Sequence, residues 1–92
     1  MPRFLIEVPH SVETMACVRE VHVFLSTGPH FLTNADWGCM DGVHCSWLIV
    51  DVASKEEARM VLPPVFREQA KIVGLNKFSL EQVEAMISGS KP

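Results

Sequence analysis

The chain has 92 residues, a formal net charge of −3 and a hydrophobic fraction of 48%. This length fits a single domain spanning residues 1–92, and the lack of a Lys or Arg cluster excludes a surface built to neutralise nucleic-acid phosphates. No apolar run approaches the ~20 residues of a membrane span, and the N-terminal apolar stretch is too short for a signal peptide, so we expect a soluble, cytoplasmic protein.

The first half of the chain predicts a strand, a helix and a hairpin. Phe4, Ile6 and Val8 alternate with the residues between them, and this period of two indicates a strand over 4–8. A helix follows the capping residue Ser11, repeats apolar residues at three- and four-residue steps, and stops at the Gly-Pro pair 28–29. Residues 32–52 predict two strands joined by an Asp-Gly pair at 41–42, which is typical of a two-residue type I′ turn.

The second half predicts a helix, a strand and a last helix. A Ser-x-x-Glu capping box at 54–57 starts a helix that ends at the Pro-Pro pair 63–64. Residues 71–78 alternate as a fourth strand, and a helix opened by Ser79 follows. We expect the last residues, 88–92, to form a frayed tail.

This order of elements, β-α-β-β-α-β plus a helix, predicts an α+β ferredoxin-like fold: a four-stranded antiparallel sheet with its helices on one face. In that order, in its Pro-Pro pair and in a fourth strand ending Asn76-Lys77-Phe78, the whole chain resembles the small stand-alone members of the dimeric α+β barrel group. That group includes metal-binding proteins and monooxygenases. The resemblance implies a homodimer in which two sheets face each other across a cavity.

The third predicted strand is apolar on both faces, and two helices can cover only one of them. A large uncovered apolar patch marks a partner surface, so we predict a homodimer through the open sheet face. The alternative is that the last helix folds over this face. One row comprises Leu48, Val50 and Val52, and the other comprises Val43, Cys45, Trp47 and Ile49.

The three cysteines, Cys17, Cys39 and Cys45, are an odd number without the spacing of a disulfide framework. Such a set is typical of a reducing compartment, where thiols stay free. We therefore expect stability to come from the core or from a partner chain.

The densest group of reactive side chains lies in residues 36–47. With Asp-Gly at the turn, Cys39 opposes His44 on one face, and the ferredoxin-like order brings His10 to the same edge. Thiolate and imidazole ligands suit zinc, nickel or copper, so we predict a transition-metal site of His10, Cys39 and His44. Nearby carboxylates would be Glu7 and Asp41, whereas His30 belongs at the opposite edge. The full register pairs Met40 with Val43, Cys39 with His44, Gly38 with Cys45, and Trp37 with Ser46.

Two other interpretations of this stretch stay open. Cys39 can be a small buried hydrophobe, with His10 and His44 as turn residues. A cysteine beside a histidine can also be a nucleophile, although no third orienting group or oxyanion hole is evident. The corresponding functions are a homodimeric binding protein, which we expect, a cofactor-independent monooxygenase or isomerase with a His base, and a purely structural dimer.

Overall fold

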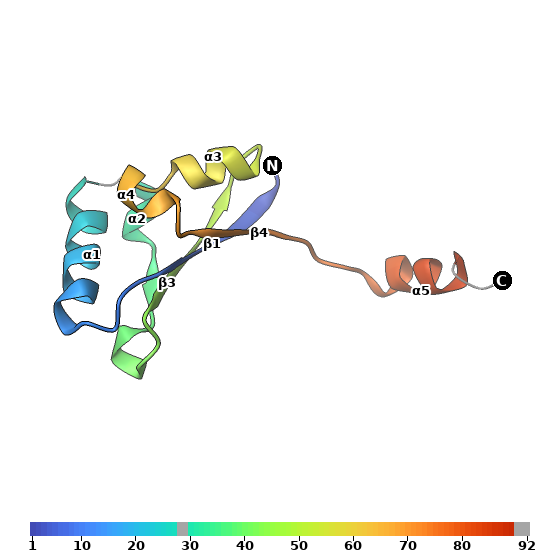
Figure 1. The fold of residues 1–92 in the computed structure, drawn as a ribbon. Helices are drawn as coiled ribbons and strands as arrows, with labels where there is room; N and C mark the ends of the chain where they lie inside the picture. Colours follow the sequence, from blue (N-terminus) through green and yellow to red (C-terminus); the bar gives the residue numbers. More distant parts are fainter. Residues whose placement is uncertain (28–29, 90–92) are drawn as a thin grey trace.

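The computed structural model describes residues 1–27 and 30–89 as an α+β fold (Figure 1). The predicted helix stop at 28–29 and the end of the predicted tail, 90–92, lie outside the described residues. The elements are, in chain order, β1 (Arg3–Pro9), α1 (Thr14–Thr27), α2 (His30–Thr33), β2 (Asp36–Trp37), a 3-10 turn η1 (Cys39–Asp41), β3 (Cys45–Asp51), α3 (Lys55–Met60), α4 (Pro64–Arg67), β4 (Lys71–Leu75) and α5 (Leu80–Gly89).

The four strands form one antiparallel sheet in the order β2-β3-β1-β4. β1 and β3 pair along their whole length, from Arg3 opposite Asp51 to Pro9 opposite Cys45. β4 pairs with the other edge of β1. The predicted four-stranded antiparallel sheet is therefore confirmed, and β3 lies between β1 and β2 as expected. This placement brings the β2–β3 connection next to the end of β1.

The core lies on one face of this sheet, because successive side chains of a strand point to opposite faces. Every second residue of β1 is buried, while Leu5 and Glu7 between them are only half-buried. Helices α1, α2 and α3 each contribute side chains to the same cluster. The buried cluster comprises Phe4, Ile6, Val8, Phe24, Leu32, Leu48, Val50, Ala58, Leu62, Ala70 and Ile72.

The β2–β3 connection differs from the predicted hairpin. α2 occupies the start of the segment in which we expected a strand, and β2 is only two residues long. Trp37 pairs with Ser46 as predicted, and the Gly38 N–H donates to the carbonyl of Cys45. Beyond this point the ladder ends, so the predicted two-residue type I′ turn is wrong, and so is the pairing of Cys39 with His44 that we derived from it.

Gly38 is the physical reason for this difference. A Cβ at this position would lie 2.7 Å from the Val43 carbonyl oxygen and 2.9 Å from the Trp47 ring. The chain can therefore fold tightly back at Gly38, whose carbonyl accepts from the N–H groups of Asp41 and Val43. Residues 39–41 then form the 3-10 turn η1, and Gly42 ends it with a φ of 80°. A left-handed φ of this kind favours glycine.

The second half of the chain follows its predicted local signals. Ser54 caps α3 by accepting from the Glu57 N–H, and the Glu57 carboxylate accepts from the Ala53 N–H. Ser79 caps α5 in the same way. However, β4 ends at Leu75, so the predicted extension of the strand through 76–78 is wrong.

α5 stands apart from the sheet at the end of an extended segment (Figure 1), and the molecule measures 56 × 28 × 20 Å. It includes residues 88 and 89, which we expected in the tail, and it has no buried residue. None of the helices in the described part of the chain is both long and apolar enough to cross a bilayer.

Candidate functional site

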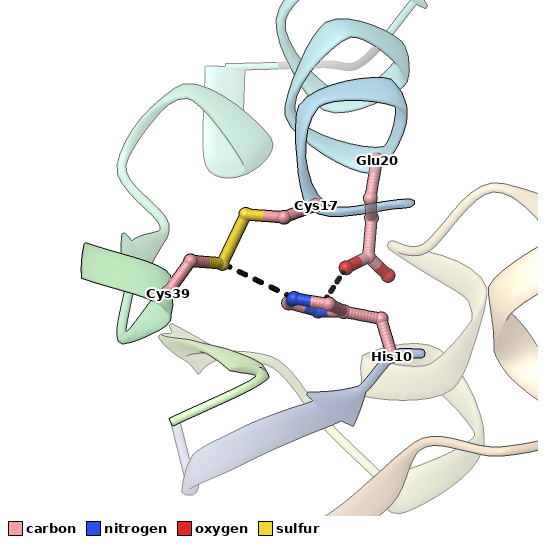
Figure 2. Close-up of a disulfide and its surroundings, with 4 residues drawn as sticks. All are labelled: His10, Cys17, Glu20 and Cys39. Atoms are coloured by element: carbon pink, nitrogen blue, oxygen red, sulfur yellow. Dashed lines mark hydrogen bonds and ion pairs between the residues drawn. A yellow bond between two sulfur atoms is a disulfide. The ribbon is translucent and has the colours of Figure 1, made fainter. Parts of the chain in front are cut away.

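A disulfide between Cys17 and Cys39 ties α1 to η1, with the two Cα atoms 6.7 Å apart (Figure 2). The expectation that all three thiols are free is therefore wrong, and the argument for a reducing compartment loses its basis. The 22-residue separation of the pair gives no signal in the sequence. It is the packing of α1 beside the β2–β3 connection that brings the two residues together. Cys45 remains a free, buried cysteine.

His10 lies directly beyond β1 and contacts the disulfide. Its Nε2 atom is 3.1 Å from the Sγ atom of Cys39, and its backbone N–H donates to the carbonyl of His44. The His10 ring is 5.8 Å from the His44 ring and 6.2 Å from the Trp37 ring, measured between centroids. The structure thus places two of the three predicted ligands, His10 and Cys39, in contact, and the His44 ring lies beside His10. His44 is not a member of the cluster of ligand atoms that lie within 4.8 Å of one another. In this state, however, Cys39 is bonded to Cys17 and has no thiolate to offer.

Glu20 is the residue of the site that sequence reasoning missed. Its carboxylate is 2% exposed, and its Oε2 atom lies 2.6 Å from the Nδ1 atom of His10, which is itself 6% exposed (Figure 2). Among the described residues, neither carboxyl oxygen has a hydrogen bond of standard geometry, so the short contact to His10 is its main polar interaction. The nucleophile hypothesis lacked a third orienting group, and Glu20 occupies that place.

A signal for Glu20 is present in the helix. It lies three residues after Cys17 and four before Phe24, and residues at these steps share one face of a helix. Two apolar residues of α1, Val18 and Leu25, are both more than half exposed. α1 instead buries the face that carries Glu20 and Phe24. Burying an acidic residue on a helix face costs free energy unless a polar group pairs with it, and His10 is that group.

The two carboxylates that we expected near the site, Glu7 and Asp41, do not lie in it. Glu7 lies on the opposite sheet face, where it accepts a hydrogen bond from Trp47 Nε1 at 3.0 Å. Asp41 is exposed on η1. His30 begins α2, and its side chain lies outside what the structure describes.

Burial favours the uncharged forms of both members of the Glu20–His10 pair. It raises the pKa of Glu20 to about 7. It also lowers the pKa of His10, and the neighbouring His44 lowers it further. A disulfide sulfur carries no hydrogen, so a hydrogen bond between His10 and Cys39 requires the Nε2–H group to donate. Neutral His10 then presents an unprotonated Nδ1 to Glu20, and the raised pKa of Glu20 favours a protonated carboxyl group below about pH 7.

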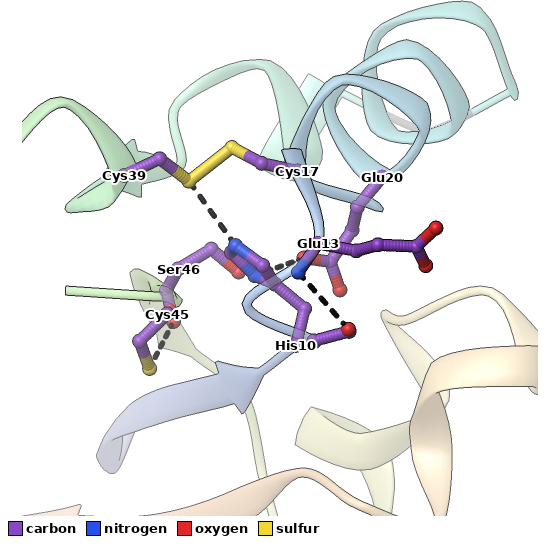
Figure 3. A network of polar contacts seen from close by, with 8 residues as sticks. His10, Glu13, Cys17, Glu20, Cys39, Cys45 and Ser46 are labelled. Carbon is purple, nitrogen blue, oxygen red and sulfur yellow. Dashed lines mark hydrogen bonds and ion pairs between the residues drawn. A yellow bond between two sulfur atoms is a disulfide. The ribbon is translucent and has the colours of Figure 1, made fainter. Parts of the chain in front are cut away.

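Figure 3 shows how the rest of the cluster is arranged around His10. Ser46 is fully buried, and its hydroxyl has no hydrogen-bond partner in the described part of the chain. The Cys45 thiol points away from the disulfide, towards the Ser46 carbonyl at 3.6 Å. Burial raises the pKa of Cys45, and the charge of Glu7 adds to this effect. Cys45 is therefore a structural thiol outside the site.

The ligand atoms of His10, Cys17 and Cys39 all lie within 4.8 Å of one another. A tetrahedral zinc ion with Zn–S bonds of about 2.3 Å and Zn–N bonds of about 2.0 Å holds its ligand atoms roughly 3.3–3.8 Å apart. The three ligand atoms lie near enough for such a geometry, provided that the disulfide is reduced and its two sulfurs move apart. Cys17 was not among the predicted ligands, because its position on a helix gave no indication of its distance from Cys39.

No protein-family model, no curated protein and no solved structure matches this chain. Its resemblance to the dimeric α+β barrel group therefore remains a prediction from the order of its elements.

Proposed function

We propose that this chain is a small binding protein whose reduced form holds one soft transition metal ion, such as zinc, nickel or copper. The ligands are His10, Cys17 and Cys39, and His44 is the neighbouring candidate for a fourth. The observation that supports this proposal is the 4.8 Å limit on the distances between the three ligand atoms. Thiolate and imidazole together favour these metals over calcium or magnesium, which prefer oxygen ligands.

Metal binding in this site requires both sulfurs as thiolates. This form exists only where a reductant such as the glutathione pool keeps the Cys17–Cys39 pair reduced. Two thiolates would neutralise the charge of a bound dication in this partly buried site. Once the metal-free protein is oxidised, Cys17 and Cys39 would form the disulfide.

A calorimetric titration of zinc into protein reduced with a phosphine tests this proposal. We expect one ion per chain, and Cys39→Ala should weaken binding by more than about tenfold, or 1.4 kcal/mol. His44→Ala tests the fourth ligand. His22→Ala is the matched control, because His22 is exposed on α1 and lies outside the cluster. Unchanged affinity in Cys39→Ala would reject the site.

We further propose that the fold is ferredoxin-like and that the chain forms a homodimer through the open face of its sheet. Leu5, Ile49 and Val73 form one cross-strand row on that face. Ile49 is 57% exposed, and the other two are half-buried. An uncovered apolar row in the centre of a sheet supports a partner surface.

Native mass spectrometry tests the dimer. We expect a mass of two chains at micromolar concentration, and Ile49→Lys should give monomers because it would bury an unpaired charge. Val65→Lys is the control, since Val65 is 67% exposed but lies on α4. A single-chain mass for the unmodified protein would reject the dimer.

A further inference from the structure

The geometry points to a second activity, thiol–disulfide exchange: an external thiol opens the Cys17–Cys39 disulfide by attacking Cys17, and His10 gives a proton to the departing sulfur of Cys39. The co-substrate class is a thiol or dithiol, either a small molecule or an exposed pair on another protein. This activity uses residues of the proposed metal site, but it takes place without a metal ion.

The contact with His10 makes the two sulfurs unequal. His10 Nε2 is 3.1 Å from Cys39 Sγ, and the described structure gives Cys17 Sγ no comparable contact. When a disulfide is cleaved, the sulfur that leaves as a thiolate departs faster if its negative charge is stabilised. A donor aimed at Cys39 therefore favours Cys39 as the leaving sulfur and Cys17 as the sulfur attacked.

Access to the disulfide is consistent with this order of events. Cys17 and Cys39 are both partly exposed, whereas Cys45 is buried. Figure 2 shows the disulfide bridging α1 and η1, with His10 and Glu20 grouped on one side of it. The partial exposure of these two cysteines supports access by a small external thiol.

The reaction has two balanced steps. In the first, the external thiolate forms a new S–S bond to Cys17, the Cys17–Cys39 bond breaks, and the electron pair goes to Cys39. Cys39 takes the proton from His10 Nε2 while the Glu20 carboxyl group gives its proton to His10 Nδ1, so the imidazole stays neutral. Glu20 then regains the proton that the attacking thiol released. In the second, the remaining thiol of the dithiol attacks its own sulfur in the mixed disulfide and releases Cys17. Two electrons pass from the dithiol to the protein, the dithiol becomes a disulfide, and its two protons end on the protein thiols.

Glu20 acts here as a positioning residue. Its carboxyl oxygen lies 2.6 Å from His10 Nδ1, so it holds the ring with Nε2 turned towards Cys39. The arrangement of carboxyl group, imidazole and sulfur is the order in which hydrolytic triads orient a base towards their nucleophile. In this site the sulfur is one half of a disulfide, and the group it meets is a thiol.

The experiment maps the mixed disulfide. Oxidised protein, kept metal-free with a chelator, is treated with glutathione, quenched with acid and digested, and the adduct is assigned to Cys17 or Cys39 by mass spectrometry. We expect the adduct mainly on Cys17. An adduct mainly on Cys39, or an equal split in the unmodified protein, would overturn the proposal without any variant being needed.

The rate of reduction by dithiothreitol gives the second measurement. His10→Gln should slow thiol release by about 100-fold, the size expected for a lost proton donor, and should equalise the two adducts. Glu20→Gln should shift the adduct ratio in the same direction while the circular dichroism spectrum stays unchanged. Glu13→Gln, an exposed carboxylate of the preceding loop, is the control.

Equal rates for the unmodified protein and His10→Gln would also overturn the proposal. Because the chelator removes metal ions, failure of zinc binding leaves both measurements unchanged. The two proposals can therefore fail separately.

Discussion

The buried Glu20–His10 pair makes the stability of this protein depend on pH in a way that two substitutions should separate. Folding raises the pKa of Glu20 to about 7 from its ordinary 4.5, and it lowers the pKa of His10. From pH 6.5 down to the lowered pKa of His10, the fold therefore carries a proton on Glu20 and lacks one on His10, relative to the unfolded chain. The two effects oppose each other, so we expect the unmodified protein to show little change in that range and to lose stability above it.

The variant His10→Gln leaves Glu20 as the titrating member of the pair. A carboxyl group with a raised pKa stabilises the fold fully below its unfolded pKa, and this contribution is lost as the pH rises through the folded value. At about 1.4 kcal/mol per pKa unit, the difference between 4.5 and about 7 corresponds to roughly 3 kcal/mol. The free energy of unfolding should thus fall by nearly this amount from pH 4 to pH 8.

The variant Glu20→Gln should have the opposite slope. His10 then remains, and a histidine with a lowered pKa costs stability as the pH falls below its unfolded value near 6.5. Urea unfolding of disulfide-intact protein, followed by tryptophan fluorescence at several pH values, measures all three curves. Slopes of the same sign in the two variants, or a flat curve for His10→Gln, would refute the assignment of the raised pKa to Glu20.

Two further predictions concern the turn and a helix cap, both measured by thermal and urea unfolding. Gly38→Ala should destabilise the fold by about 1–3 kcal/mol, because the new Cβ would meet the Val43 carbonyl and the Trp47 ring at under 3 Å. Gly89→Ala is the control, because a Cβ at that position meets nothing within 4 Å. Equal losses of stability in the two variants would contradict the steric explanation. Ser54→Ala should cost about 1 kcal/mol because α3 loses its capping acceptor, and a loss below the error of the measurement would show that the cap contributes nothing.

Local chemistry in the sequence was enough to predict most of the elements. The alternation in β1, the capping boxes at Ser54 and Ser79 and the Pro-Pro pair act on their immediate neighbours, so their effect does not depend on the rest of the fold. The pairing of Trp37 with Ser46 also followed from the sequence, because a hairpin connection this short leaves little freedom in register.

The turn itself could not be obtained in this way. An Asp-Gly pair favours a type I′ turn in isolation, but the close approach of the Val43 carbonyl and the Trp47 ring to Gly38 decides where the chain reverses. That approach depends on how β3 packs, which the turn residues do not encode.

In the candidate site, too, the sequence predicts one part and the tertiary structure decides the rest. The sequence predicted that His10 lies next to the β2–β3 connection that carries Cys39 and His44, because strand order fixes which strand ends meet. The tertiary structure alone decided that Cys17 bonds to Cys39 and that Glu20 faces His10. Both residues lie on α1, and the rotation of a helix about its own axis depends on the whole core against which it packs. The pairing of the two cysteines and the pKa of Glu20 follow from that rotation.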